Sequence, residues 1–141
     1  MLRKATRSDM PRIFEIRRSV RENQLADTFE EYVDLAGPFV DGGNCWVWDE
    51  NGDVLGEAGY DPCTGYIEVL YVDPVAEGRG VGRALLEQCC IDLCKLGHKV
   101  ATLSTPAGTR AEHMYRAGGW VEVGIDAVGD LLFQKHLERK P

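Results

Sequence analysis

Three glycines alternate at positions 78, 80 and 82, between a β-type run and a helical run. The preceding segment, Gly65 to Val72, is rich in aromatic and β-branched residues, which is typical of a buried strand. The following segment repeats apolar residues at helical spacing from about Gly82 to Leu96, and Gly97 is expected to end that helix. A strand, a tight turn and a long helix in succession restrict the chain to an α/β fold, in which the helix covers a sheet.

The other segments predict the order β-α-α-β-β-β-α-β-α-β-β, a single-domain mixed sheet over residues 1–141. The expected strands are Leu2–Ala5, Cys45–Asp49, Val54–Tyr60, Gly65–Val72, Val100–Thr105, Trp120–Val123 and Leu131–Lys135. Ser8, Thr28 and Thr109 are expected to cap helices, and Gly37-Pro38 is expected to stop the second one. Asn51-Gly52 predicts a hairpin with the four-residue loop 50–53.

Charge and composition exclude several classes of function. With 23 acidic against 16 basic residues, the net charge is −7, which disfavours binding to nucleic acid or to an anionic membrane. No apolar run reaches the length of a membrane span and no signal peptide is recognisable, so we expect a cytoplasmic protein. The five cysteines form no C-x-x-C pair, which predicts free thiols and no metal site.

The glycine turn has the properties of an anion site. Glycines let the backbone approach a ligand closely, and the N-terminus of a helix carries partial positive charge. Arg79 and Arg83 add positive charge beside the turn, so a phosphate group is the expected ligand. The pattern matches neither the P-loop nor the dinucleotide-binding glycine motif. A strand-to-helix turn without a ligand is the alternative, although such a turn needs only one glycine.

Two segments together resemble the GCN5-related N-acetyltransferase (GNAT) superfamily. Residues 77–82, Glu-Gly-Arg-Gly-Val-Gly, are similar to its Q/R-x-x-G-x-G/A signature, and residues 111–120 are similar to its A-x-x-L/F-Y-x-x-x-G-F/W segment. The resemblance implies that acetyl-CoA is the co-substrate, with its diphosphate on Gly78, Arg79, Gly80, Val81, Gly82, Arg83 and Ala84. It also implies that the backbone of Leu70, Tyr71 and Val72 pairs with the pantetheine arm.

The chain departs from the family pattern at two positions. Glu77 stands where the family usually has Gln or Arg, and a carboxylate beside a diphosphate should weaken binding. Gly108 stands where the family often has Asn, so a side-chain contact to the donor is expected to be missing.

The chemistry of acetyl transfer needs a base for the amine and a proton for the leaving thiolate. The resemblance implies that Tyr115 is the general acid; an ordinary packed aromatic is the alternative. Glu68 is the candidate base, because a carboxylate is unfavourable in an otherwise apolar strand and its presence therefore suggests a function. A solvated or salt-bridged residue is the alternative. Strict alternation would place Tyr66, Glu68 and Leu70 on one face of their strand. Glu57, on the neighbouring strand, is the second candidate base.

The sequence indicates the identity of the acetyl acceptor less clearly than that of the acetyl donor. The resemblance places the acceptor groove near the end of the first helix, around Arg17, Arg18, Glu22 and Asn23. An acidic protein favours a cationic acceptor, so an amine of a small molecule or a peptide is expected. A non-catalytic acyl-CoA sensor and a protein N-terminal acetyltransferase remain as alternatives. Many members of the superfamily pair up, so a homodimer stays open.

Overall fold

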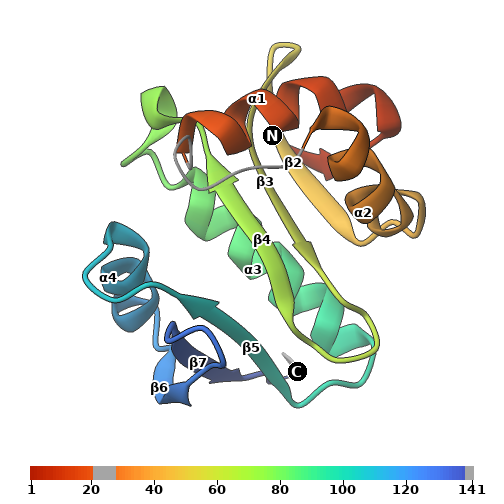
Figure 1. The fold of residues 1–141 in the computed structure, drawn as a ribbon. Coiled ribbons are helices and arrows are strands. Elements are labelled where there is room, and N and C mark those ends of the chain that lie inside the picture. Colours follow the sequence, from red (N-terminus) through yellow and green to blue (C-terminus); the bar gives the residue numbers. More distant parts are fainter. Residues whose placement is uncertain (21–27, 139–141) are drawn as a thin grey trace.

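A computed structural model describes residues 1–20 and 28–138. The order of helices and strands agrees with the expected one, with two short 3₁₀ turns added, η1 (Arg7–Asp9) and η2 (Pro74–Ala76) (Figure 1). The strands are β1 (Leu2–Lys4), β2 (Cys45–Glu50), β3 (Asp53–Tyr60), β4 (Ile67–Val72), β5 (Val100–Thr105), β6 (Val121–Ile125) and β7 (Leu131–His136). The helices are α1 (Met10–Val20), α2 (Phe29–Asp41), α3 (Val81–Lys95) and α4 (Arg110–Ala117). Within the described ranges, no helix has the length and apolar character needed to cross a bilayer.

The strands form two antiparallel sheets that adjoin where β4 lies next to β5. The first has the order β1-β2-β3-β4 and the second the order β5-β7-β6. One parallel bridge, between Tyr66 and Thr102, connects β4 with β5, which makes the whole a mixed sheet. From this bridge the two strands diverge, and Figure 1 shows the gap between their ribbons widening toward α4.

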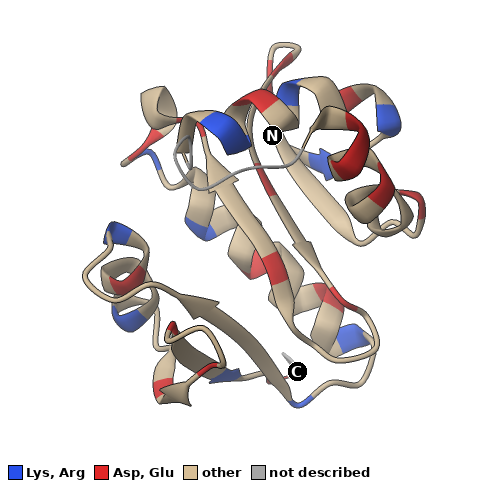
Figure 2. Ribbon diagram, in the orientation of Figure 1, with Lys and Arg blue, Asp and Glu red and all other residues tan. Residues whose placement is uncertain are grey.

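Helices cover both faces of the four-stranded sheet, and the charged residues lie mainly on helices and loops rather than on the strands (Figure 2). One buried cluster joins α3 with the two sheets and includes Leu85, Leu93, Leu103 and Phe133. The second cluster lies under α1 and α2 and is built on residues such as Ile13. Packing in these two buried clusters fixes the positions of β4 and of the N-terminus of α3, which are the elements that build the site.

Three local expectations are wrong. Helix α2 does not stop at Gly37-Pro38 but continues to Asp41, because Val40 is buried in the second cluster and the Gly42 amide donates to the Pro38 carbonyl at 3.0 Å. Ser8 lies inside η1, and the segment starts at Thr6 instead. The hairpin turn consists of Asn51-Gly52 alone, both with positive φ, so each flanking strand is one residue longer than expected.

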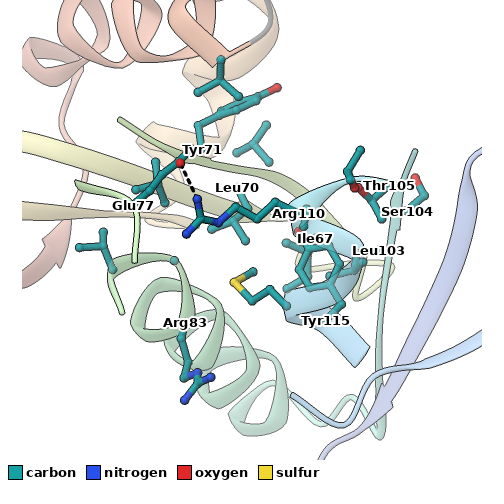
Figure 3. Close-up of a pocket in the computed structure, with 18 of the residues that line it drawn as sticks. Ile67, Leu70, Tyr71, Glu77, Arg83, Leu103, Ser104, Thr105, Arg110 and Tyr115 are labelled. Carbon is teal, nitrogen blue, oxygen red and sulfur yellow. Dashed lines mark hydrogen bonds and ion pairs between the residues drawn. The ribbon is translucent and has the colours of Figure 1, made fainter. Parts of the chain in front are cut away.

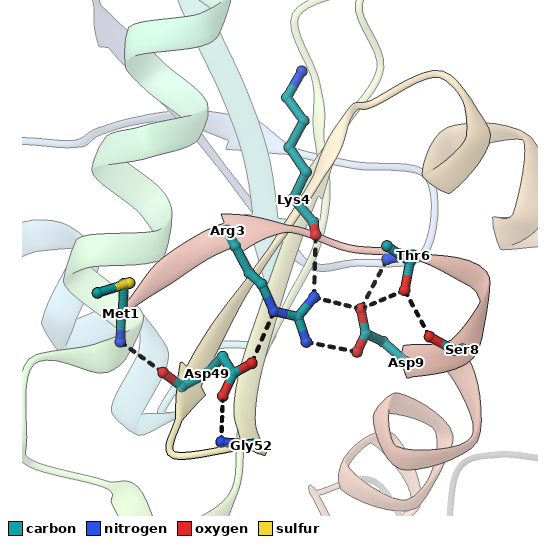
Figure 4. Close-up of polar contacts among 8 residues, drawn as sticks. All are labelled: Met1, Arg3, Lys4, Thr6, Ser8, Asp9, Asp49 and Gly52. Atoms are coloured by element: carbon teal, nitrogen blue, oxygen red, sulfur yellow. Dashed lines mark hydrogen bonds and ion pairs between the residues drawn. The ribbon is translucent and has the colours of Figure 1, made fainter.

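A polar network holds the N-terminal strand in place (Figure 4). The guanidinium of Arg3 donates two hydrogen bonds of 2.8 Å to the Asp9 carboxylate and a third of 2.8 Å to Asp49. The Thr6 amide also donates to Asp9, at 2.8 Å. Hydrogen bonding to Arg3 holds the pKa of both carboxyls below the usual value, so this stabilisation is lost as the pH falls through those lowered pKa values.

Asp92 ties α3 to the sheet through two aromatic side chains. Its carboxylate accepts hydrogen bonds from the Trp46 indole at 2.7 Å and from the Tyr60 hydroxyl at 2.9 Å. Burial, followed by the bond to Asp92, raises the pKa of Tyr60. Because Tyr60 is only 4% exposed, its hydroxyl has little access to water as a substitute partner.

We expect Asp92→Ala to lower the free energy of unfolding by about 2 kcal/mol, because both donors lose a charged partner. Asp92→Asn keeps one acceptor oxygen and should cost less. Urea denaturation measures both, with Glu87→Ala on the exposed side of α3 as the control. An Asp92→Ala variant as stable as the control variant would contradict the assignment.

Candidate functional site

The opening between β4 and β5 contains a cavity of about 910 Å³. Strand β4 is the last strand of its sheet, so beyond the Tyr66–Thr102 bridge one of its edges has no partner among the described strands. The N–H and C=O groups that point outward from such an edge can pair with an extended ligand. The cavity runs along this edge, including Leu70, Tyr71 and Val72, and reaches the N-terminus of α3 at one side and α4 at the other (Figure 3).

The glycine turn forms one end of the cavity. Gly78 and Gly80 have φ values of +79° and +82°, a conformation that side chains strongly disfavour. Gly80 is the N-cap of α3, and no side chain within residues 1–20 and 28–138 caps this helix end. The first turn also contains no acidic residue. Its amides are therefore left for an external acceptor, and a negatively charged one is favoured by the helix dipole.

Most of the expected diphosphate residues lie around this cavity, but two do not. Gly78, Gly80, Val81, Gly82 and Arg83 line it. Ala84 does not line the cavity, because it lies beyond the first residues of the helix. Arg79 does not line it either: one guanidinium nitrogen donates to both oxygens of Glu50, at 2.7 and 2.8 Å. The positive charge expected from Arg79 is thus directed toward the β2–β3 hairpin.

Glu77 has a partner that the sequence analysis did not identify. Nη1 of Arg110, the first residue of α4, donates to the Glu77 carboxylate at 2.9 Å across the cavity (Figure 3). This ion pair offsets the negative charge that was expected to repel a diphosphate. The available signal was the position of Arg110, which lies between the capping residue Thr109 and the second family-like segment, residues 111–120. Gly108 stands where the family often has Asn. Its backbone amide donates a hydrogen bond to the Glu112 carboxylate at 2.7 Å.

Tyr115 lies on α4, on the side of the cavity opposite the glycine turn. Its side chain is 6% exposed and packs against the rings of Trp120 and Phe133, with centroid distances of 6.1 Å each. Burial raises the pKa of its phenol to about 12. The hydroxyl therefore keeps its proton at neutral pH, as a proton donor must.

Glu68 lies at an irregularity in β4, which changes the face that was expected for it. The register of β4 against β3 shifts here, pairing Gly59 with Val69 but Tyr60 with Ile67, and Glu68 is the extra residue. The expected alternation is therefore wrong: Ile67 and Leu70 pack against the same cluster although they are three residues apart. Glu68 itself is exposed and lines the cavity. Partial burial and the nearby Asp61 raise its pKa.

Glu57 is the more unusual carboxylate, although it does not line the cavity. It is 3% exposed on β3, opposite Tyr71 in the register, and Tyr71 belongs to the cluster under α1 and α2. Burial raises the pKa of Glu57 to about 7, against a smaller lowering effect of Arg17. Burial thus favours the protonated form of Glu57 to a higher pH than for an exposed glutamate.

The expected acceptor residues are described only in part. Arg17 and Arg18 lie in the last turn of α1. Arg17 stacks over the Tyr32 ring at 5.4 Å, and Arg18 stacks over the Phe14 ring at 5.7 Å. Glu22 and Asn23 fall outside the described residues. Val20, the last residue of α1, lines the cavity, which places this helix end beside the site.

A comparison with protein families decides what kind of site this is. The family described as "Acetyltransferase (GNAT) domain" matches residues 41–122, which include the edge strand, the glycine turn and all of the second motif. The chain belongs to the GNAT acetyltransferase family. The strand edge and the glycine turn that line the cavity between β4 and β5 fall within the matched residues.

Individual relatives agree with this assignment. The mycothiol acetyltransferase of Propionibacterium freudenreichii subsp. shermanii is 38% identical over 96 residues, which are 66% of this chain but only 27% of that protein. A ribosomal-protein-alanine N-acetyltransferase from Brucella melitensis has a TM-score of 0.82 at 27% identity, covering 97% of this chain and 99% of that one. YncA from Salmonella typhimurium, solved with its cofactor acetyl-CoA, has a TM-score of 0.81 at 20% identity, covering 99% and 95%.

Proposed function

We propose that the protein transfers an acetyl group directly from acetyl-CoA to a primary amine of a small molecule or a peptide. One observation carries the proposal: a single cavity joins an unpaired strand edge, an uncapped glycine turn and a protonated tyrosine. Acetyl-CoA has a part for each of these, namely the amide-bearing pantetheine arm, the diphosphate and the thioester. That a GNAT relative was solved with acetyl-CoA supports the choice of donor.

The residues present fit this donor. The amides at residues 78–83 would hold the diphosphate, since the turn has no cap and no acidic residue in the helical first turn. The edge of β4 that faces away from β3 would pair with the amides of the pantetheine arm at Leu70 and Val72, beside Tyr71, as an added strand does. This pairing would place the thioester near the β4 irregularity, on the side of Tyr115.

The chemistry then requires two proton transfers. The neutral amine attacks the thioester carbonyl carbon, a C–N bond forms, and the C–S bond breaks to release the thiolate. Tyr115 donates its phenolic proton to the sulfur, and Glu68, which lines the cavity, accepts the proton of the amine. Glu57 has a pKa better suited to a base at neutral pH, but it lies outside the cavity and reaches the amine only through water.

Turnover with a panel of amines tests the proposal. The panel contains polyamines, aminoglycosides, amino acids, amino sugars bearing a cysteinyl amine, and peptides that begin with alanine. The last two are included because relatives are a mycothiol acetyltransferase and a ribosomal-protein-alanine N-acetyltransferase. Loss of thioester absorbance is the better readout, because Cys63 is exposed and would react with a thiol reagent. Mass spectrometry identifies the acetylated product.

We expect at least one amine to be acetylated, with release of one CoA for each product. Tight binding of CoA without turnover on any amine would contradict the enzyme proposal. That outcome would instead favour a non-catalytic acyl-CoA sensor.

A further inference from the structure

The ion pair between Glu77 and Arg110 joins the two sides of the cavity. Glu77 follows η2 just before the glycine turn, and Arg110 begins α4 on the opposite side (Figure 3). The two residues are 33 positions apart in the sequence, so the contact depends on the fold rather than on local geometry. Both side chains line the cavity.

The guanidinium of Arg110 also lies over the glycine turn. Its Nη1 donates to Glu77 at 2.9 Å, whereas its Nη2 is 3.7 Å from the point where a Cβ on Gly78 would lie. A guanidinium has five N–H donors in a planar fork, so one nitrogen can stay on Glu77 while the other binds a second anion. The second nitrogen therefore lies beside the glycine turn, where the diphosphate is expected.

The other arginines of the turn do not occupy this position. Arg79 is bound to Glu50 and lies outside the cavity lining. Arg83 lines the cavity but extends from α3, away from Arg110 in Figure 3. Among the described lining residues, Arg110 and Arg83 are the two cations, against the carboxylates of Glu68, Glu77 and Asp130. Arg110 is the cation that approaches Gly78.

We propose that Arg110 binds the donor diphosphate and that Glu77 is the residue that positions it. The inference rests on the proposed function, because it concerns the same donor. Glu77 stands where the family usually has Gln or Arg. Arg110 supplies from α4 a guanidinium near the turn, whereas the guanidinium of Arg79 is bound to Glu50. With Arg110 in place, the Glu77 carboxylate is neutralised; without Arg110, it repels the diphosphate. The two residues therefore act as a unit.

Calorimetric titration at low salt tests this with two ligands, acetyl-CoA and S-acetylpantetheine, which lacks the diphosphate. We expect Arg110→Ala to weaken acetyl-CoA binding about 30-fold, because it removes a charge-assisted hydrogen bond and unmasks Glu77. Binding of S-acetylpantetheine should change by less than about twofold, since the lost contact is absent from this ligand. Arg110 is exposed, so a melting curve should show the variant to be folded.

A matched control and a double variant complete the design. Arg116→Ala removes another arginine of α4, bound to Glu112 and Glu122 outside the cavity lining, and should leave acetyl-CoA binding unchanged. In a Glu77→Gln background, Arg110→Ala should weaken acetyl-CoA binding only about 10-fold, because no unpaired carboxylate is left behind.

Three results would each overturn a different part of the proposal. Equal acetyl-CoA affinity of wild type and Arg110→Ala, or an equal loss for both ligands, would overturn the role of Arg110. An equal loss from Arg110→Ala in the wild-type and Glu77→Gln backgrounds would overturn the positioning role of Glu77. Failure of the wild type to bind acetyl-CoA at all would instead refute the proposed function.

Discussion

Tyr115→Phe is expected to lower kcat about 100-fold and to leave the KM for acetyl-CoA nearly unchanged. The phenol is held protonated by its buried surroundings, and the variant removes only the oxygen that would give its proton to the leaving sulfur. The ring contacts with Trp120 and Phe133 remain, so the fold should keep its stability. Steady-state kinetics with the best acceptor from the amine panel measures the effect.

Tyr66→Phe is the matched control, because it removes another tyrosine hydroxyl from the same cavity. The Tyr66 hydroxyl contacts Ser104 rather than the proposed position of the thioester. We expect its kcat to fall by less than about threefold. Equal kcat losses in the two variants, or a fully active Tyr115→Phe enzyme, would remove Tyr115 from the proposed mechanism.

Glu57→Gln is expected to stabilise the protein at pH 8 by about 2–4 kcal/mol. The pKa of Glu57 rises from its usual 4.5 to about 7 on folding, because burial disfavours the charged carboxylate. The contribution of Glu57 to stability is therefore complete below its unfolded pKa and is lost as the pH rises through about 7. Glutamine resembles the protonated form at every pH, so the two proteins should become equally stable near pH 4.

Urea denaturation at several pH values measures this difference. Glu68→Gln is the control, since Glu68 is exposed and its substitution should change stability by less than about 0.5 kcal/mol. A constant difference between wild type and Glu57→Gln across the pH range would show that Glu57 does not titrate as argued. The same two variants identify the base: we expect turnover to fall in Glu68→Gln and to persist in Glu57→Gln.

The order of the elements and the place of the turn followed from local patterns. Thr28 and Thr109 do cap their helices, each accepting a hydrogen bond from the amide three residues on at 3.2 Å. Asn51-Gly52 does form the hairpin turn. These features depend on neighbouring residues, which sequence patterns report well.

The errors arose where distant parts of the chain decide local structure. Helix α2 passes through Gly37-Pro38 because the core buries Val40, and at Gly37 an added Cβ would lie 2.6 Å from Arg7. The face of Glu68 depends on a register shift between two strands. Arg79 was expected beside the donor and Arg110 was not identified, because the ion pairs Arg79–Glu50 and Arg110–Glu77 join residues that are remote in sequence.

A crystal structure of the complex with acetyl-CoA tests the central claim most directly. We expect the diphosphate to lie within hydrogen-bond distance of the amides of residues 78–83, with the pantetheine arm along the outer edge of β4 and the sulfur beside Tyr115. A donor bound elsewhere on the protein, or a diphosphate that contacts none of these amides, would contradict it.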